Sequence, residues 1–235
     1  MDRRQLLLLE KRRYQLEEKI SEKELKMLED NVPIQKIIGY LEMANVTINL
    51  DHHVLIPRYE TEELILLIKE KIKTLNSILD IGTGSGFIAL ALAKIYPNAL
   101  IDAVDISDEA IKQSQKNALL NDIKNVHFFK SNVFENVSKT YNLIVANPPY
   151  LILEDIPDKT ILDHEPEAAL IAKDDGLNVY KKILKDYDKY LNKGGWLFFE
   201  INHRHSNFFV KFNFKTVKDI NGKIRFAYYQ KGADA

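Results

Sequence analysis

The stretch Ser77-Ile78-Leu79-Asp80-Ile81-Gly82-Thr83-Gly84-Ser85-Gly86-Phe87 joins an apolar run, residues 77–81, to a helical pattern that begins at Phe87. Three glycines at alternate positions let the backbone approach a ligand closely, because glycine has no Cβ atom. A glycine loop between a strand and a helix is similar to a nucleotide-binding fingerprint. The spacing here is G-x-G-x-G, however, which differs from the G-x-G-x-x-G of dinucleotide-binding proteins.

Apolar runs and helical patterns alternate downstream of this loop, and Asn221-Gly222 predicts a tight hairpin at the end of the chain. Helices separating strands imply right-handed crossovers and a parallel sheet, with the ligand beyond the carboxyl ends of the strands. We therefore predict a doubly wound α/β domain with a mostly parallel seven-stranded sheet. The expected strands are residues 77–81, 100–104, 126–129, 142–146, 196–201, 214–220 and 223–229, and the expected helices are residues 87–95, 107–120 and 177–191, the last ended by Lys193-Gly194-Gly195.

The chain before this domain is expected to form two further parts. Residues 1–32 predict a short helical segment, in which Ser21 and Glu24 have the form of a capping box. Residues 33–58 predict a linking β-hairpin, with strands at 37–43 and 46–50 followed by an extended stretch at 54–56. The α/β domain then spans residues 59–235 and opens with a helix that runs to about Lys73.

The composition narrows the class of protein. The 235 residues contain no cysteine, which excludes a disulfide framework and thiolate chemistry and favours the cytosol. No apolar run approaches the roughly 20 residues that a membrane helix needs. The net charge of −1 gives no basic field for nucleic acid. We expect a cytoplasmic monomer that binds neither membranes nor, stably, nucleic acid.

A second motif, Asn147-Pro148-Pro149-Tyr150, follows the apolar run that ends at Ala146. Neither proline can continue a central strand, so the turn is stiff. Its Asn147 side-chain oxygen and Pro148 carbonyl can accept two N–H bonds from a planar amide or amine, on which Tyr150 can stack. The alternative is a plain strand-ending turn.

Two acids flank the glycine loop. Asp80 precedes it, and Asp105 ends the next strand, where ribose hydroxyls are read. A phosphate would be repelled by Asp80, whereas a ligand with a cationic amino group suits it. A glycine turn that only packs helix on strand is the alternative.

These features together resemble the S-adenosylmethionine-dependent methyltransferases. The resemblance implies that Asp80 and the loop hold the methionine part of the cofactor, that Asp105 holds the ribose, and that the loop after strand three faces adenine. Many relatives carry Asp where this chain has Asn132, which can still hydrogen-bond the adenine edge. The implied cofactor-binding residues are Asp80, Gly82, Thr83, Gly84, Gly86, Asp105, Ile106, Asn132, Val133 and Asn147.

More closely, the chain resembles the HemK/PrmC type, the N5-glutamine methyltransferases that modify peptide chain release factors. Four stretches carry this resemblance: Ile37-Ile38-Gly39-Tyr40, residues 55–62, Asn147-Pro148-Pro149-Tyr150, and Glu165-Pro166-Glu167-Ala168-Ala169-Leu170 with Asp175-Gly176-Leu177 behind it. It implies a release factor as the protein substrate and Asn147, Pro148 and Tyr150 as catalytic residues. The implied substrate-binding residues are Asn147, Pro148, Pro149, Tyr150, Glu165 and Pro166.

The chain departs from the family at two places. Tyr59 stands where the family usually has proline. About 30 residues precede the hairpin, where relatives usually carry a longer helical domain that helps grip the release factor. The roles of Arg58, Glu60, Glu62 and Glu200 stay open.

A sulfonium methyl group is strongly electrophilic, so the expected chemistry is orientation of the amide nitrogen without a metal or a dedicated general base. An acidic lid at residues 154–167 disfavours a polyanionic substrate. Its charged residues are Glu154, Asp155, Asp158, Asp163, Glu165 and Glu167 against Lys159. Rival hypotheses are an adenine-N6 methyltransferase acting on nucleic acid, methylation of another protein's glutamine such as a ribosomal protein's, a non-catalytic binding module, and a nicotinamide dehydrogenase.

Overall fold

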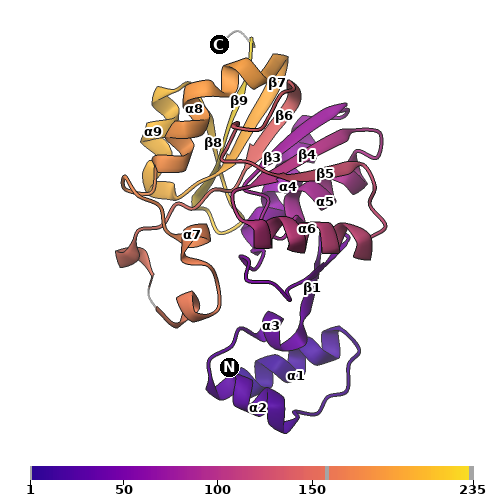
Figure 1. Cartoon of the computed structure of the whole chain (residues 1–235). Coiled ribbons are helices and arrows are strands. Elements are labelled where there is room, and N and C mark those ends of the chain that lie inside the picture. The colour runs from indigo at the N-terminus through magenta and orange to yellow at the C-terminus, as the bar shows by residue number, and fades with distance from the viewer. Residues whose placement is uncertain (1, 157–158, 233–235) are drawn as a thin grey trace.

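A seven-stranded, mostly parallel sheet organises the part of the chain that the computed structural model describes, residues 2–156 and 159–232 (Figure 1). The strand order is β5-β4-β3-β6-β7-β9-β8, and only β9 runs antiparallel to its two neighbours. This confirms the predicted fold class. The strands are β3 (Ser77–Ile81), β4 (Leu100–Asp105), β5 (Val126–Lys130), β6 (Tyr141–Ala146), β7 (Leu191–Glu200), β8 (Lys215–Lys218) and β9 (Ile224–Gln230).

Helices cover both faces of this sheet, and neighbouring residues of each strand enter different cores. Ile78 and Leu143 pack with α4, α5 and α6, whereas Leu79 and Ile144 pack with α8 and α9. A parallel sheet buried on both faces reads as continuous apolar runs, which is why these strands could be predicted. The helices are α4 (Tyr59–Lys71), α5 (Phe87–Ile95), α6 (Asp108–Leu120), α8 (Asn178–Tyr190) and α9 (Ser206–Lys211).

The chain winds outward from β3 in one direction to β4 and β5, then returns to place β6 on the other side of β3. This reversal is a topological switch point, where ligands of open α/β sheets bind. The carboxyl ends of β3, β4 and β6 therefore define the place of the site.

The helices α1, α2 and α3 lie below the sheet in Figure 1, and the hairpin formed by β1 and β2 packs in the same core as α4 and α5. The capping box is confirmed, since Ser21 accepts a hydrogen bond from the Glu24 N–H and the Glu24 carboxylate accepts one from the Ser21 N–H. The elements are α1 (Arg3–Arg13), α2 (Glu22–Glu29), α3 (Ile34–Ile38) and the antiparallel pair β1 (Tyr40–Met43) and β2 (Val46–Asn49).

Two local expectations about extended segments were wrong, one at residues 37 and 38 and one in the final hairpin. Residues 37 and 38 end the helix α3, because Gly39, with a φ of 91°, terminates it before β1 begins at Tyr40. The stretch at residues 54–56 pairs with no strand, and the Ile56 N–H instead donates to a side chain, as described below. The final hairpin has a longer connection than the two residues expected, since Lys218 pairs with Ile224.

The helix before β7 ends within a residue of its expected position, but the glycines expected to end it do not do so. Helix α8 ends at Tyr190 and the chain enters β7 at once, so Gly194 and Gly195 lie within the strand. The pairing of β6 with β7 shifts register between Tyr141 and Leu143, opposite this glycine pair. The two glycines therefore lie at an irregularity in the pairing of β7 and do not cap a helix.

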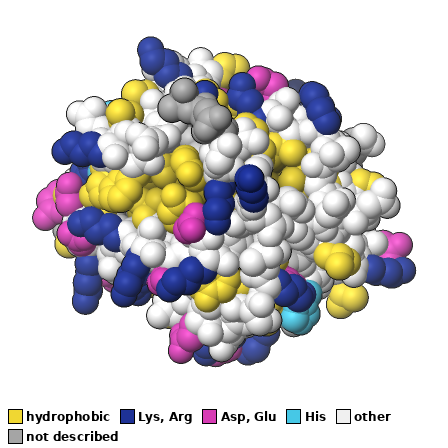
Figure 2. All heavy atoms as spheres, turned by 90° about the horizontal axis from the view of Figure 1, so that it is seen from above, with side chains coloured by type: hydrophobic (Ala, Val, Ile, Leu, Met, Phe, Trp, Pro, Cys, Tyr) yellow, Lys and Arg dark blue, Asp and Glu magenta, His cyan; other side chains and the backbone are white. Residues whose placement is uncertain are grey.

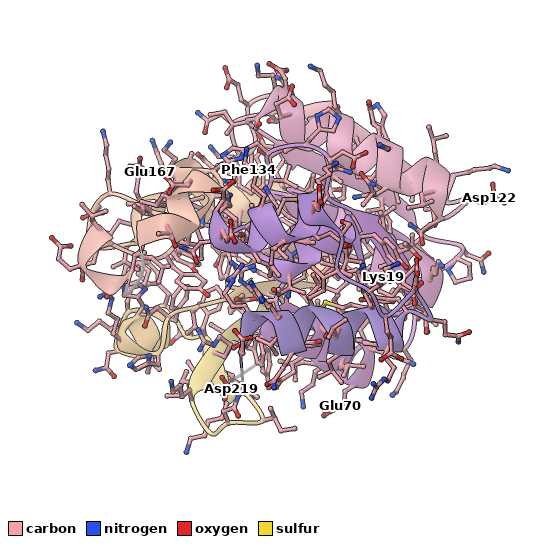
Figure 3. All side chains as sticks on the ribbon, turned by 90° about the horizontal axis from the view of Figure 1, so that it is seen from below. Lys19, Glu70, Asp122, Phe134, Glu167 and Asp219 are labelled. Atoms are coloured by element: carbon pink, nitrogen blue, oxygen red, sulfur yellow. The ribbon has the colours of Figure 1, made fainter. Side chains whose placement is uncertain are left out.

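Short elements between β6 and α8 form the lid over one side of the molecule. The lid elements are η1 (Leu153–Asp155), η2 (Lys159–Asp163) and α7 (Glu167–Leu170). A further short helix outside the lid, η3 (His203–His205), follows β7. Seen from below in Figure 3, Glu167 of α7 and Asp122 beyond α6 lie at opposite margins. Asp158 lies outside the described residues. None of the described helices is both long enough and apolar enough to cross a membrane.

Candidate active site at the switch point

A cavity of about 300 Å³ lies at the carboxyl ends of β3, β4 and β6. It brings together the glycine loop, the end of β4, the loop after β5 and the asparagine turn, which are far apart in sequence. Of the residues expected in the site, those that line the cavity are Gly82, Thr83, Gly84, Asp105, Ile106, Asn132, Val133, Asn147, Pro148, Pro149 and Pro166.

The glycine loop presents open backbone to the cavity. A Cβ atom added at Gly82 or Gly84 would meet no atom within 4 Å, so both residues border empty space. Gly86 differs, because a Cβ there would lie 3.0 Å from the Cβ of Ser114 on α6. Gly82 and Gly84 therefore leave room for a ligand, whereas Gly86 allows α5 to pack closely on α6.

Asp80 lies beneath this loop with no exposed surface. Its Oδ2 atom accepts a hydrogen bond of 2.7 Å from the Thr83 hydroxyl, while its buried Oδ1 atom has no partner. Burial raises the pKa of Asp80 to about 7. A buried, half-satisfied carboxylate is costly in an empty site and becomes favourable when a cation binds nearby.

Asp105 fixes the shape of the loop from the neighbouring strand. Its carboxylate accepts hydrogen bonds of 2.9 Å from the Gly84 N–H and from the Ser107 N–H. Burial raises the pKa of Asp105. Asp105 also lines the cavity, so it can receive hydroxyl groups of a ligand while it holds Gly84 in place.

The asparagine turn faces the glycine loop across the cavity. The Asn147 Nδ2 atom donates a hydrogen bond of 3.1 Å to the Thr61 hydroxyl of α4. With its nitrogen engaged, the amide of Asn147 offers its Oδ1 atom to a ligand. Tyr150 does not line the cavity; its hydroxyl donates to Glu200 at 3.2 Å, and its ring packs on the core beneath α8.

Glu165 also lies outside the cavity, where it clamps the lid to the segment before α4. Only 1% of its surface is exposed, and its two oxygens accept hydrogen bonds from the Ile56 N–H at 2.9 Å and from Arg58 Nη2 at 2.7 Å. This clamp satisfies the Ile56 N–H, which has no strand partner. It brings Pro166 and Leu55 to the same wall of the cavity.

The sequence patterns did not single out two buried residues beside the turn, Thr61 and Glu200, as parts of the site. Thr61 is 4% exposed and lines the cavity, and Glu200 is 1% exposed. Burial raises the pKa of Glu200 to about 7. The only signal in the sequence was the position of each: Thr61 within the stretch 55–62, and Glu200 at a strand end.

Gly176 packs closely against the backbone of Tyr150 in the asparagine turn. We therefore expect Gly176→Ala to lower both stability and activity. A Cβ there would lie 2.4 Å from the Tyr150 carbonyl oxygen, and the φ of +81° disfavours alanine. We expect a loss of about 2–4 kcal/mol in the free energy of unfolding. Gly222→Ala is the matched control, because its φ is +80° with nothing within 4 Å of the added Cβ. Equal losses in denaturant melts of the two variants would contradict this role.

Comparison with known proteins agrees with this geometry. Residues 61–162 match the family model of the methyltransferase small domain. The release factor glutamine methyltransferase of Lactococcus lactis subsp. lactis is 37% identical over an alignment that covers 89% of this chain and 84% of that protein.

Two solved structures share the architecture. A ribosomal protein L11 methylase from Lactobacillus delbrueckii subsp. bulgaricus has a TM-score of 0.54 and 26% identity, over 78% of this chain and 85% of that one. The N-terminal domain of human METTL16, solved in complex with SAH, has a TM-score of 0.55 over 80% of this chain and 76% of that one; at 17% identity it shows the fold alone. From its sequence relatives, the chain belongs to the family of release factor glutamine methyltransferases.

Proposed function

We propose that this chain transfers a methyl group from S-adenosylmethionine to the side-chain amide nitrogen, N5, of the Gly-Gly-Gln glutamine in peptide chain release factors. One observation carries the proposal: the asparagine turn and the glycine loop line the same cavity, and the bond to Thr61 leaves Asn147 with a free acceptor. The residues proposed to bind the cofactor and those proposed to bind a planar amide therefore line one cavity.

The residues of the cradle fit the proposed cofactor. The unpartnered Asp80 oxygen and the open space at Gly82 and Gly84 suit a cationic methionine part. Thr83 also lines that part of the cradle, whereas Gly86, expected there from the sequence, packs α5 on α6 instead. Asp105 and Ile106 would hold the ribose, and Asn132 and Val133 would face adenine. When bound, S-adenosylmethionine supplies an electrophilic methyl group on a sulfonium.

The asparagine turn would hold the glutamine. The Asn147 Oδ1 atom and the Pro148 carbonyl oxygen accept the two N–H bonds of the amide, which directs the nitrogen lone pair and favours the positive charge that develops there. Alignment for in-line attack can supply up to about 7–11 kcal/mol in well-oriented systems. The nitrogen becomes acidic once it is methylated, so we propose neither a dedicated general base nor a metal.

The remaining substrate residues would shape the entrance. Pro149 and Pro166 line the cavity directly, whereas Tyr150 and Glu165 lie outside it, where Tyr150 bonds Glu200 and Glu165 bonds Arg58. We propose that a protein loop, rather than a nucleic acid strand, enters here. Figure 2 shows the opposite face, at the amino ends of the strands, where Lys and Arg are spread among acidic and hydrophobic side chains.

The lid is less acidic than its composition suggests, because two of its acids are paired. Asp155 binds Arg204 at 2.7 Å, and Glu165 binds Arg58 at 2.7 Å. Its unpaired charge still disfavours a polyanion, though less strongly than the sequence alone implied. We expect the enzyme to act as a monomer in the cytoplasm.

The decisive experiment is transfer of label from S-adenosylmethionine to purified release factor. The matched control is the release factor whose Gly-Gly-Gln glutamine is changed to alanine, and total RNA, DNA and ribosomal proteins are offered in parallel. Label on the unmodified factor alone is the expected result. Label on RNA or DNA alone, or equal label on the alanine variant, would overturn the proposal.

A further inference from the structure

A buried carboxylate lies between the two ends of the asparagine turn. Strands β6 and β7 are parallel neighbours, and Ala146 pairs with Phe199. Glu200, the last residue of β7, therefore lies beside Asn147. Only 1% of Glu200 is exposed. Its backbone carbonyl accepts a hydrogen bond of 2.6 Å from the Tyr180 hydroxyl, which fixes the strand end.

Each oxygen of this carboxylate is connected to one end of the turn. The Oε2 atom accepts a hydrogen bond of 2.7 Å from the Thr61 hydroxyl, which in turn accepts the 3.1 Å bond from Asn147 Nδ2. The Oε1 atom accepts the 3.2 Å bond from the Tyr150 hydroxyl. Glu200 is thus connected to Asn147 through the Thr61 hydroxyl and to Tyr150 by a direct hydrogen bond.

Counting protons in this chain of bonds fixes the orientation of the asparagine amide. A threonine hydroxyl has one proton and two lone pairs. When it donates its proton to an ionised Glu200, it has only lone pairs left for Asn147. The NH₂ group of Asn147 must then face Thr61, and its oxygen must face the cavity.

We propose that Glu200 is a positioning residue that acts through Thr61 to turn the oxygen of Asn147, rather than its NH₂ group, toward the substrate nitrogen. The consequence for catalysis rests on the proposed function, because the oxygen is needed to accept an N–H bond from the glutamine. The flipped amide would place two N–H donors against each other and would not orient the substrate.

The protonation state of Glu200 controls this arrangement. The pKa of Glu200 is raised to about 7, chiefly by burial and also by the charge of Glu60, against the lowering effect of its bonds to Thr61 and Tyr150 and of the charge of Arg225. A protonated Glu200 can donate to Thr61, which can then donate to the Asn147 oxygen and stabilise the flipped amide. The rate should therefore rise as the pH rises through this pKa.

The first test needs no substrate. In ¹⁵N-labelled protein, the side-chain NH₂ signal of Asn147 is identified by its loss in Asn147→Ala. We expect this signal to titrate with a midpoint near the Glu200 pKa of about 7, and to stop doing so in Glu200→Gln and in Thr61→Val. A signal that does not titrate in the wild-type protein, or that titrates unchanged in Thr61→Val, would overturn the proposal.

The second test uses the methylation rate at saturating S-adenosylmethionine, so that titration of the cofactor site does not contribute. We expect Thr61→Val to lower kcat by about 10–100-fold, with the KM for S-adenosylmethionine within about threefold of wild type, and Thr61→Ser to restore most of the rate because it keeps the hydroxyl. We also expect Glu200→Gln to abolish the rise of kcat with pH.

Thr216→Val on the edge strand β8 is the matched control, since it makes the same chemical change at a residue that does not line the cavity. Wild-type kcat in Thr61→Val, or equal losses in Thr61→Val and Thr61→Ser, would sink the positioning role. A wild-type enzyme that labels no release factor would instead refute the proposed function, and the NMR titration would still decide whether Glu200 orients Asn147.

Discussion

Replacing Asn147 by alanine is expected to lower kcat by about 10²–10³-fold, the range seen when one preorganised polar contact to a reacting centre is removed. The variant loses the side-chain oxygen that accepts an N–H bond from the substrate amide, while the glycine loop, Asp80 and Asp105 keep their contacts. Affinity for S-adenosylmethionine should therefore stay within about threefold of wild type. Single-turnover methylation and calorimetric titration of the cofactor measure the two quantities.

Asn142→Ala is the matched control for this experiment. Asn142 lies near the other end of β6, where its side-chain oxygen accepts a hydrogen bond from the Ser77 hydroxyl. The same substitution there should leave kcat near the wild-type value. Near-wild-type turnover of Asn147→Ala, or loss of cofactor binding in that variant to the same extent as loss of turnover, would contradict the assigned role.

The sheet could be predicted from sequence because its strands are buried on both faces and separated by helices. Residues 77–81 and 142–146 are mostly apolar for this reason, and their expected boundaries agree with β3 and β6 to within a residue. The errors lie where the local signal was ambiguous. Ile37 and Ile38 are apolar residues that suit a strand or a helix, and only the position of Gly39 in the fold decides between them.

The parts of the site that could be predicted are those formed by consecutive residues at strand ends. The glycine loop and the asparagine turn each carry their chemistry within a few positions, and the order of parallel strands brings them together. The supporting contacts could not be predicted, because they join distant residues. Thr61 bonds Glu200 across 139 positions and Ile56 bonds Glu165 across 109, and such pairings depend on which strands become neighbours.

The second large effect is expected at Asp80, where S-adenosylmethionine affinity should depend on pH. Burial raises the pKa of Asp80 to about 7 in the free protein, so below that pH the carboxyl group must lose a proton before it can stabilise a cation. We expect the Kd to fall about tenfold for each pH unit up to about 7 and to level off above it. Calorimetric titrations at several pH values measure this dependence.

Asp80→Asn should remove the pH dependence and weaken cofactor binding about 10–100-fold at pH 8, because a neutral amide loses the charge-assisted interaction. Asp102→Asn is the matched control: Asp102 is a buried carboxylate on β4 that accepts a hydrogen bond from Tyr141, away from the cavity. It should leave the cofactor affinity unchanged. A pH-independent Kd in the wild-type protein would contradict the role of Asp80.

The same substitution should stabilise the cofactor-free protein, which separates binding from folding. The raised pKa means that between about pH 4 and pH 7 the unfolded chain loses its Asp80 proton while the folded chain keeps it. The free energy of unfolding therefore falls as pH rises through that window, by up to about 4 kcal/mol. Denaturant melts should show Asp80→Asn more stable than wild type at pH 8 and similar to it at pH 4. An acid that destabilises the empty protein and is needed to bind a cation is retained for binding, since folding alone would favour its loss.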